Sequence, residues 1–166
     1  EGGTNSLAIK GTSEILSEHH QEYSHVCTSI GTGGTFAGLA QSLQPKQTLI
    51  GFSSLKGEFI RKEIEQLVLA NAIQTLGKLE INTAYHFGGY AKWTTELIEV
   101  INWFWDEFGI PLDPIYTSKM VAGFFDLVKK NQFTPGSKIL LIHTGGLQGL
   151  SGFQHRTGIQ LPILLV

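Results

Sequence analysis

Charged side chains are scarce in this chain. Only 16% of its 166 residues are Asp, Glu, Lys or Arg, whereas 42% are hydrophobic, and the mean hydropathy is +0.05. A disordered chain has the opposite composition, so these residues are expected to fold into one domain with a proper core. The net charge is −2 and no long Lys/Arg run occurs, which argues against nucleic acid as a partner.

Cysteine is nearly absent as well. The single thiol, Cys27, excludes an internal disulfide and is compatible with a reducing compartment, so we expect a cytoplasmic protein. No apolar run approaches the ~20 residues that cross a bilayer, so no membrane partner is expected. The apolar end, 159–166, is far shorter and predicts a buried terminal strand or segment. No two His, Cys, Asp or Glu positions show the spacing of a metal site.

The chain opens at Glu1-Gly2-Gly3, in a turn-like stretch without an initiator Met. Together with the apolar composition, this opening predicts a piece of a longer protein. The sequence contains no internal repeat, low-complexity tract or obvious linker. We therefore expect part of a single domain rather than several domains.

Hydrophobic periodicity, with Gly and Pro between the periodic segments, predicts helices that alternate with strands. Helices are expected at 7–20, 36–43, 58–76, 94–108 and 119–130, and strands at 25–30, 47–52 and 138–143, with 80–87 extended or irregular. Thr94 or Thr95 should cap the fourth helix, and Gly109 should end it. The last strand is apolar on both faces, which is typical of a central parallel strand. The alternation predicts a layered α/β fold with a mostly parallel sheet.

The strand at 25–30 runs directly into Gly31-Thr32-Gly33-Gly34-Thr35, and a helix follows. Glycines let backbone N–H groups converge, the helix start adds unpaired N–H donors, and the threonines add hydroxyls. Such a loop suits a terminal phosphate. The dinucleotide fingerprint is not met, because its third glycine would fall at Phe36, and no P-loop Gly-Lys-Ser/Thr follows. A glycine turn without a ligand is the alternative.

A second strand end repeats this design, because 139–142 leads into His143-Thr144-Gly145-Gly146. Ligands of parallel α/β sheets bind outside the carboxyl ends of the strands, so both glycine turns are expected to line one crevice. A purely structural turn is again the alternative. We expect His143 to orient this turn.

A third candidate segment is Leu112–Lys119. By pattern alone, Thr117 or Ser118 caps the helix that follows, and Tyr116 is a packed aromatic residue.

Several collinear motifs together resemble one enzyme family. They are Glu1-Gly2-Gly3-Thr4-Asn5, Gly31 to Gly38, Gly89-Tyr90, Leu112 to Thr117 and His143 to Gly146. In this order and approximate spacing they resemble the 1-aminocyclopropane-1-carboxylate deaminase / D-cysteine desulfhydrase family. These are fold-type II pyridoxal-phosphate enzymes related to the tryptophan synthase β subunit. The resemblance implies the three-layer, parallel-sheet large domain of that fold, incomplete at its N-terminus, with pyridoxal 5'-phosphate as cofactor and a small amino acid as substrate.

The resemblance also implies a role for each candidate residue. Gly31 through Thr35 resemble the phosphate-binding loop, and Tyr90 and Tyr116 resemble two active-site tyrosines beside the substrate. Thr117 corresponds to the position that faces the pyridine nitrogen, and Thr144 resembles a second hydroxyl there. The deaminases have a glutamate at the Thr117 position. A neutral hydroxyl favours the pyridinium less, which implies a D-cysteine desulfhydrase-like elimination rather than opening of a cyclopropane.

The family's cofactor-carrying lysine, and the Ser/Asn residues after it, lie in an N-terminal segment that has no counterpart here. None of the chain's lysines occupies that motif. The resemblance therefore implies that the small domain is missing too, that the N-terminal half of the same enzyme is a partner, and that the complete enzyme is a homodimer. The isolated chain is predicted to hold phosphate or the cofactor weakly and to turn over nothing. Two alternatives stay open: a deaminase of the cyclopropane amino acid, and a non-catalytic half-domain that binds phosphate or a partner chain.

Overall fold

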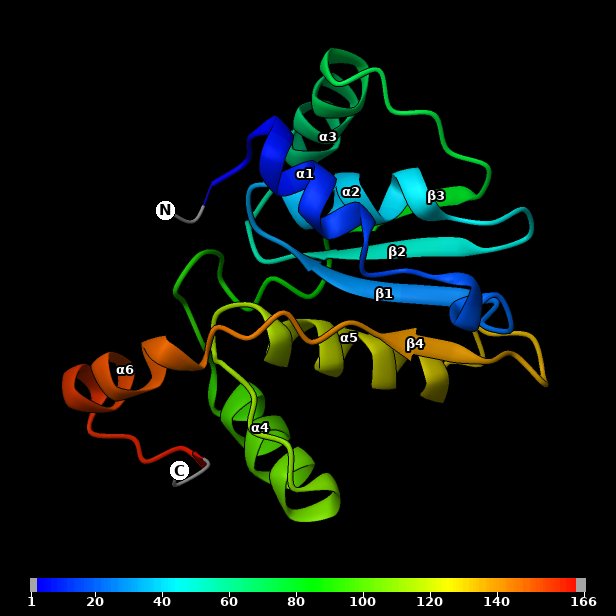
Figure 1. The fold of residues 1–166 in the computed structure, drawn as a ribbon. Helices are drawn as coiled ribbons and strands as arrows, with labels where there is room; N and C mark the ends of the chain where they lie inside the picture. The colour runs from blue at the N-terminus through cyan, green and yellow to red at the C-terminus, as the bar shows by residue number, and fades with distance from the viewer. Residues whose placement is uncertain (1–2, 164–166) are drawn as a thin grey trace.

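The structure, a computed structural model, describes residues 3–163 and contains a four-stranded sheet in the order β3-β2-β1-β4 (Figure 1). The strands are β1 His25–Ile30, β2 Thr48–Ser53, β3 Lys78–Asn82 and β4 Ile139–Leu141. All pairings are parallel. The carboxyl ends of the strands therefore open at one edge of the sheet. The predicted α/β class with a parallel sheet is confirmed.

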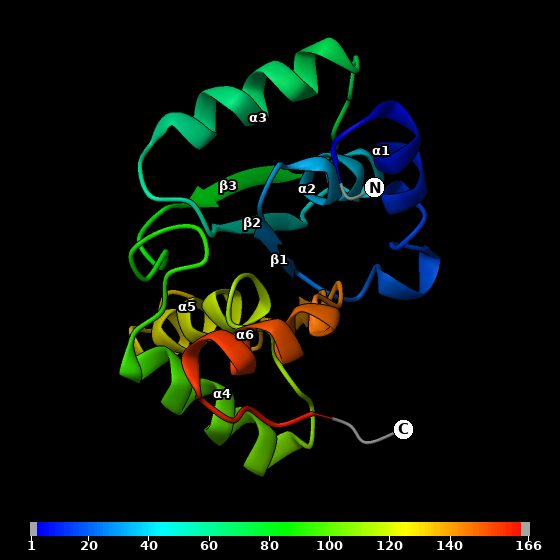
Figure 2. The ribbon, with the colours of Figure 1, turned by 90° about the vertical axis from the view of Figure 1, so that its left-hand side faces the viewer.

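Helices cover both faces of the sheet and give three layers (Figures 1 and 2). On one face lie α1 Ser6–Ser13, α2 Gly34–Ser42 and α3 Phe59–Ala70; on the other lie α4 Thr95–Phe108, α5 Thr117–Lys129 and α6 Leu150–Thr157. Short 3-10 turns occur at η1 Glu18–His20 and η2 Leu147–Gly149. Within residues 3–163, no helix combines the length and apolarity that a bilayer crossing requires.

Each face of the sheet carries its own hydrophobic cluster, because side chains alternate along a strand. On β1, Val26 and Ile30 belong to the cluster under α1–α3, whereas Cys27 belongs to the cluster under α4–α6. The fully buried Phe36 and Phe52 lie in the first and the second cluster respectively. The two central strands are therefore buried along almost their whole length, and only His25 and Thr48 at their starts are half-buried.

Two helices end earlier than their periodicity predicts. α1 stops at Ser13 rather than at position 20. Near its end the hydroxyls of Thr12 and Ser13 donate to the carbonyl oxygens of Ala8 at 3.0 Å and Lys10 at 2.7 Å, bonds that weaken a helix slightly. α3 ends at Ala70 instead of 76.

α4 follows its prediction at both ends. The Thr94 hydroxyl accepts from the backbone N–H of Leu97 at 3.3 Å, and Gly109 ends the helix in a left-handed conformation with φ +64°.

The segment 80–87, predicted to be extended or irregular, is both: residues up to Asn82 belong to β3 and pair with β2, and 83–87 are irregular. One strand prediction needs correction. β4 was predicted to be central and buried on both faces, whereas among the described residues it is a half-buried edge strand. An apolar sequence indicates that a strand is buried, but it does not indicate whether the strand has one neighbouring strand or two. In the terminal segment Leu161 is buried and 159–163 form no strand, and 164–166 lie outside the described residues.

Candidate functional site

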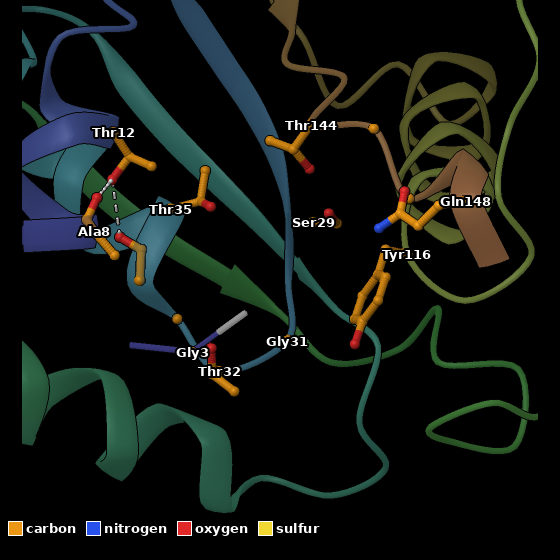
Figure 3. A pocket seen from close by; sticks show the side chains of 14 residues that line it. Gly3, Ala8, Thr12, Ser29, Gly31, Thr32, Thr35, Tyr116, Thr144 and Gln148 are labelled. Atoms are coloured by element: carbon orange, nitrogen blue, oxygen red, sulfur yellow. Dashed lines mark hydrogen bonds between the residues drawn. The ribbon is translucent and has the colours of Figure 1, made fainter. Parts of the chain in front are cut away.

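A cavity of about 360 Å³ opens at the carboxyl ends of β1 and β4, two adjacent strands. It is lined by the loop after β1 and by the turn after β4, so the predicted shared crevice is present. Figure 3 shows the side chains of Thr144, Gln148 and Tyr116 on one side of it and that of Thr35 on the other. Small-molecule sites have volumes of about 300–1,000 Å³, so the cavity is of a suitable size.

The loop Gly31–Thr35 carries the chain from β1 into α2. Gly33 precedes the helix with φ +91°, and a Cβ there would lie 2.3 Å from Cδ1 of Ile64. No side chain caps α2, although Gly34 and Thr35 line the cavity. The first N–H groups of the helix and the positive end of its dipole therefore lie at the cavity without a capping partner. This is the arrangement that binds a phosphate.

The two threonines of the loop have different surroundings. Thr32 is exposed, and the Thr4 hydroxyl lies 2.8 Å from its Oγ1 and 3.0 Å from its carbonyl oxygen. Thr35 is half-buried at the cavity. Neither side chain is buried among packed residues, so both remain accessible to an anion. In the sequence Thr4 stands only within the first motif, and no local pattern indicates that its hydroxyl supports this loop.

Tyr116 packs directly against the loop. A Cβ at Gly31 would lie 2.9 Å from Cε1 of Tyr116, so the ring can approach this closely only because the residue is glycine. Burial raises the pKa of the Tyr116 phenol to about 12, and hydrogen bonding with Tyr90 and the charges of Tyr90 and Asp113 act in the same direction. The phenol is therefore protonated at neutral pH and can donate a hydrogen bond, but it is not an ionised base.

Tyr90 lies beside the cavity rather than in its lining. Its ring centroid is 6.1 Å from that of Tyr116, and 57% of the residue is exposed. It lines a neighbouring pocket together with Lys92, Trp93 and Arg156. The structure thus brings the two predicted tyrosines together as a pair, with Tyr116 toward the cavity.

A buried carboxylate organises the start of α5. Asp113 accepts from the backbone N–H groups of Ile115 at 2.8 Å, Tyr116 at 2.7 Å and Thr117 at 2.8 Å. This carboxylate caps the start of α5, a role that was predicted for Thr117 or Ser118. Those two residues are instead the first residues of the helix. The correction has a simple cause, because a carboxylate with two oxygens can satisfy several orphan N–H groups at once. Thr117 is fully buried and does not line the cavity.

Thr144 is exposed at the cavity, in the turn that follows β4. Nδ1 of His143 accepts from the backbone N–H of Gly145 at 3.1 Å, and its Nε2 lies 2.9 Å from the carbonyl oxygen of Pro111. This pattern fixes the neutral tautomer with the proton on Nε2. His143 orients the turn, as predicted.

Three polar residues of the cavity lining were not among the predicted site residues: Thr12, Ser29 and Gln148. Ser29 is the second-last residue of β1 and only 8% exposed, so its place at a strand end beside the glycine loop could have identified it. Gln148 follows the second glycine turn. Within residues 3–163, no group of three or more His, Cys, Asp or Glu residues could hold a metal ion.

Comparison with known proteins agrees with this geometry. Residues 2–145 match the family model described as pyridoxal-phosphate dependent enzyme. A protein of Pyrococcus horikoshii with the provisional name 1-aminocyclopropane-1-carboxylate deaminase is 32% identical over 152 residues, 85% of this chain and 45% of that protein. A D-cysteine desulfhydrase of Klebsiella pneumoniae is 31% identical over 166 residues, 92% of this chain and 51% of that protein. The crystal structure of an ACC deaminase homologue superimposes with a TM-score of 0.74 at 29% identity, over 90% of this chain and 47% of that one.

The chain spans about half the length of the curated relatives it matches. The residues present fit the cofactor of the family, because the uncapped glycine loop suits its phosphate and the cavity has room for a small molecule. The family model covers most of the chain. By sequence and by fold, this chain belongs to the family of pyridoxal-phosphate dependent enzymes.

Proposed function

We propose that the complete protein is a pyridoxal-phosphate dependent lyase that acts on a small amino acid of the D-cysteine type. The reaction removes the α-proton, expels sulfide from the β-carbon and, with one molecule of water, yields ammonia and a 2-keto acid. The bound cofactor supplies the electron sink that makes α-proton removal possible. The observation that carries the proposal is the uncapped glycine loop at the cavity, Gly31–Thr35, in a chain that matches this family.

The loop is proposed to hold the cofactor's phosphate. Backbone N–H groups at the start of α2 and the hydroxyls of Thr32 and Thr35 would donate to the phosphate oxygens. The helix dipole stabilises a dianion at this position. This assignment accounts for a glycine-rich loop at a strand end where the following helix begins without a side-chain cap.

Thr117 and Thr144 are proposed to lie on the side of the pyridine nitrogen, Thr144 in the lining of the cavity and Thr117 buried outside that lining, with different hydrogen-bonding capacity. The Thr117 hydroxyl donates its proton to Oδ2 of Asp113 at 2.6 Å, so toward another group it offers only a lone pair. The Thr144 hydroxyl is exposed at the cavity and would be the donor to an uncharged nitrogen. Neither group carries the negative charge that favours a pyridinium, which supports β-elimination over cyclopropane opening.

Tyr116 is proposed to hold a proton next to the substrate. Its phenol, with a pKa of about 12, stays protonated and can donate to a group on the substrate that gains negative charge. Tyr90 lies beside it and would complete this wall of the site.

Cofactor binding can be tested on the chain itself. Titration with pyridoxal 5'-phosphate should shift the amide NMR signals of residues 31–35, and pyridoxal, which lacks the phosphate, should not. Inorganic phosphate should produce weaker shifts at the same amides. Equal shifts from pyridoxal and its phosphate would remove the proposed role of the loop.

Turnover requires the complete protein. It should show a visible absorbance band that borohydride bleaches, and it should release sulfide and a 2-keto acid from D-cysteine. The matched substrates are L-cysteine and 1-aminocyclopropane-1-carboxylate. A 2-keto acid from the cyclopropane substrate, with no sulfide from either cysteine, would favour the deaminase instead.

Replacing Thr117 by Glu tests the substrate assignment, and the structure dictates its control. The new carboxylate would take the place of a hydroxyl that lies 2.6 Å from Asp113, and two carboxylates so close repel each other. The substitution is therefore best made both alone and together with Asp113→Asn. We expect the folded double variant to gain activity on the cyclopropane substrate relative to D-cysteine. An unchanged substrate ratio in that variant would count against the assignment of Thr117.

A further inference from the structure

Lys119 is a fully buried lysine on α5 that the proposed chemistry does not use. Its Nζ donates to the carbonyl oxygen of Gly89 at 2.7 Å and lies 3.5 Å from that of Ser54. Burying an ammonium group costs free energy unless it is paired and hydrogen-bonded. The Gly89 carbonyl makes the shorter of the two contacts. This hydrogen bond therefore stabilises the buried ammonium and fixes the position of the Gly89 carbonyl.

The two carbonyls belong to different loops at the carboxyl edge of the sheet. Ser54 directly follows β2, whereas Gly89 lies between β3 and α4 and directly precedes Tyr90. Gly89 is buried and has φ +112°, and a Cβ there would lie 3.3 Å from Cβ of Lys56. The backbone that carries Tyr90 is thus held in a conformation that favours glycine.

Lys119 is also linked to the other tyrosine, through the helix. It follows Tyr116 by one turn of α5, and residues three apart lie on the same face of a helix. One side chain therefore connects the helix that carries Tyr116 to the peptide that carries Tyr90. The two rings, with centroids 6.1 Å apart, are the groups that this connection brings together.

We propose that Lys119 is a positioning residue, whose ammonium fixes the Gly89 carbonyl and thereby places Tyr90 against Tyr116. A methionine would occupy a similar volume but has no donor, so packing alone does not require a lysine here. Asp113 favours the charged form of Lys119, although burial is the larger influence and lowers the pKa of Lys119 to about 8. The ammonium therefore predominates at neutral pH. The value of this arrangement for catalysis rests on the proposed function, whereas its effect on the two rings does not.

The test compares the full chain with Lys119→Met, using ¹³C-labelled tyrosine. Lys129→Met is the matched control, because Lys129 lies on the same helix and is exposed. In the wild type and the control we expect a nuclear Overhauser effect between the rings of Tyr90 and Tyr116. In Lys119→Met it should be lost, while the signals of Tyr23 and Tyr85 stay in place. A folded Lys119→Met that keeps the effect between the two rings would overturn the proposal.

A measurement on the wild type covers the case in which Lys119→Met fails to fold. A buried, hydrogen-bonded ammonium exchanges slowly, and a scalar coupling across the hydrogen bond should connect ¹⁵Nζ of Lys119 with the carbonyl carbon of Gly89. An ammonium in fast exchange with water, or coupled only to another carbonyl, would contradict the proposal.

In the complete enzyme, Lys119→Met should lower kcat about 10- to 100-fold, because misplacing an aligned group by about 1 Å can cost 100-fold, with KM changed less than about threefold. An inactive complete wild-type enzyme would refute the proposed function, and the NMR result would still decide the role of Lys119.

Discussion

The hydroxyl of Thr117 donates to Oδ2 of Asp113 at 2.6 Å, and its oxygen accepts from the backbone N–H of Asp113 at 3.0 Å. Both residues are buried, and together they close a ring at the start of α5. The turn after β4 packs against the same group, since a Cβ at Gly146 would lie 3.0 Å from Cγ of Asp113. Because α5 begins next to Tyr116, this pair fixes the residue that packs against the glycine loop.

Asp113→Asn should therefore destabilise the chain by about 2–3 kcal/mol. The new NH₂ group cannot accept from the Thr117 N–H, which would stay buried without a partner. Urea unfolding measures the change, and Asp106→Asn on the exposed face of α4 is the control. Equal midpoints for the two variants would show that Asp113 does not organise α5.

Gly33→Ala should cost more stability than Gly136→Ala. Both glycines have a left-handed backbone, with φ +91° and +85°. An alanine in this conformation lowers the free energy of unfolding by about 1–2 kcal/mol. Space around Gly136 is open, whereas a Cβ at Gly33 would lie 2.3 Å from Cδ1 of Ile64. We expect the extra cost at Gly33 to be about 1–3 kcal/mol. Ile64→Val removes that methyl group and should recover part of the loss in a double variant; no recovery would contradict the steric explanation.

The stability of the chain should depend on pH through Lys119. Burial lowers its pKa from 10.5 to about 8 in the folded chain. Between these values the unfolded chain binds more protons than the folded one, so the Lys119 contribution to the free energy of unfolding rises with pH. From pH 7 to 10 the wild type should gain stability relative to Lys119→Met. A constant difference between them across this range would show that the pKa is not lowered.

The stability of the wild type must be compared with that of Lys119→Met, because other titrating groups change the free energy of unfolding in the opposite direction. Burial raises the pKa of Tyr116 and that of Cys27, each to about 12, so their contributions to stability fall in alkaline solution. The effect of Cys27 cancels in the difference, because the substitution leaves its surroundings unchanged. The effect of Tyr116, whose ordinary pKa is 10.0, is small below about pH 9, so the comparison is clearest there.

The thiol of Cys27 should be inert in the folded chain. Cys27 is fully buried, and burial, with a smaller effect from Glu80, raises its pKa to about 12. Since the thiolate is the reactive form, a thiol reagent at pH 8 should react at least about 100-fold more slowly than in urea. Rapid labelling of the native chain would mean that β1 is not covered on the face of α4 and α5.

Local chemistry alone determined the parts of this protein whose interactions act within a few residues. α4 begins after Thr94 and ends at Gly109 as predicted, because a cap and a left-handed glycine act within one helical turn. The glycine loop after β1 was equally predictable, since Gly31–Thr35 lies between an apolar strand and a helix. Helix length was less predictable: α1 ends at Ser13 and α3 at Ala70, because apolar periodicity indicates that a helix is present and not where it stops.

Only the tertiary structure decided which residues meet. Lys119 and Lys129 lie on the same helix and look alike in sequence, yet one is buried against the Gly89 carbonyl and the other is exposed. Tyr90 and Tyr116 come from separate segments, and their pairing depends on where those segments pack. Likewise β4 is apolar on both faces but has one neighbour among the described residues. The physical reason is the same in each case: a residue's own chemistry sets which contacts it can make, and the packing of distant elements sets which of them it makes.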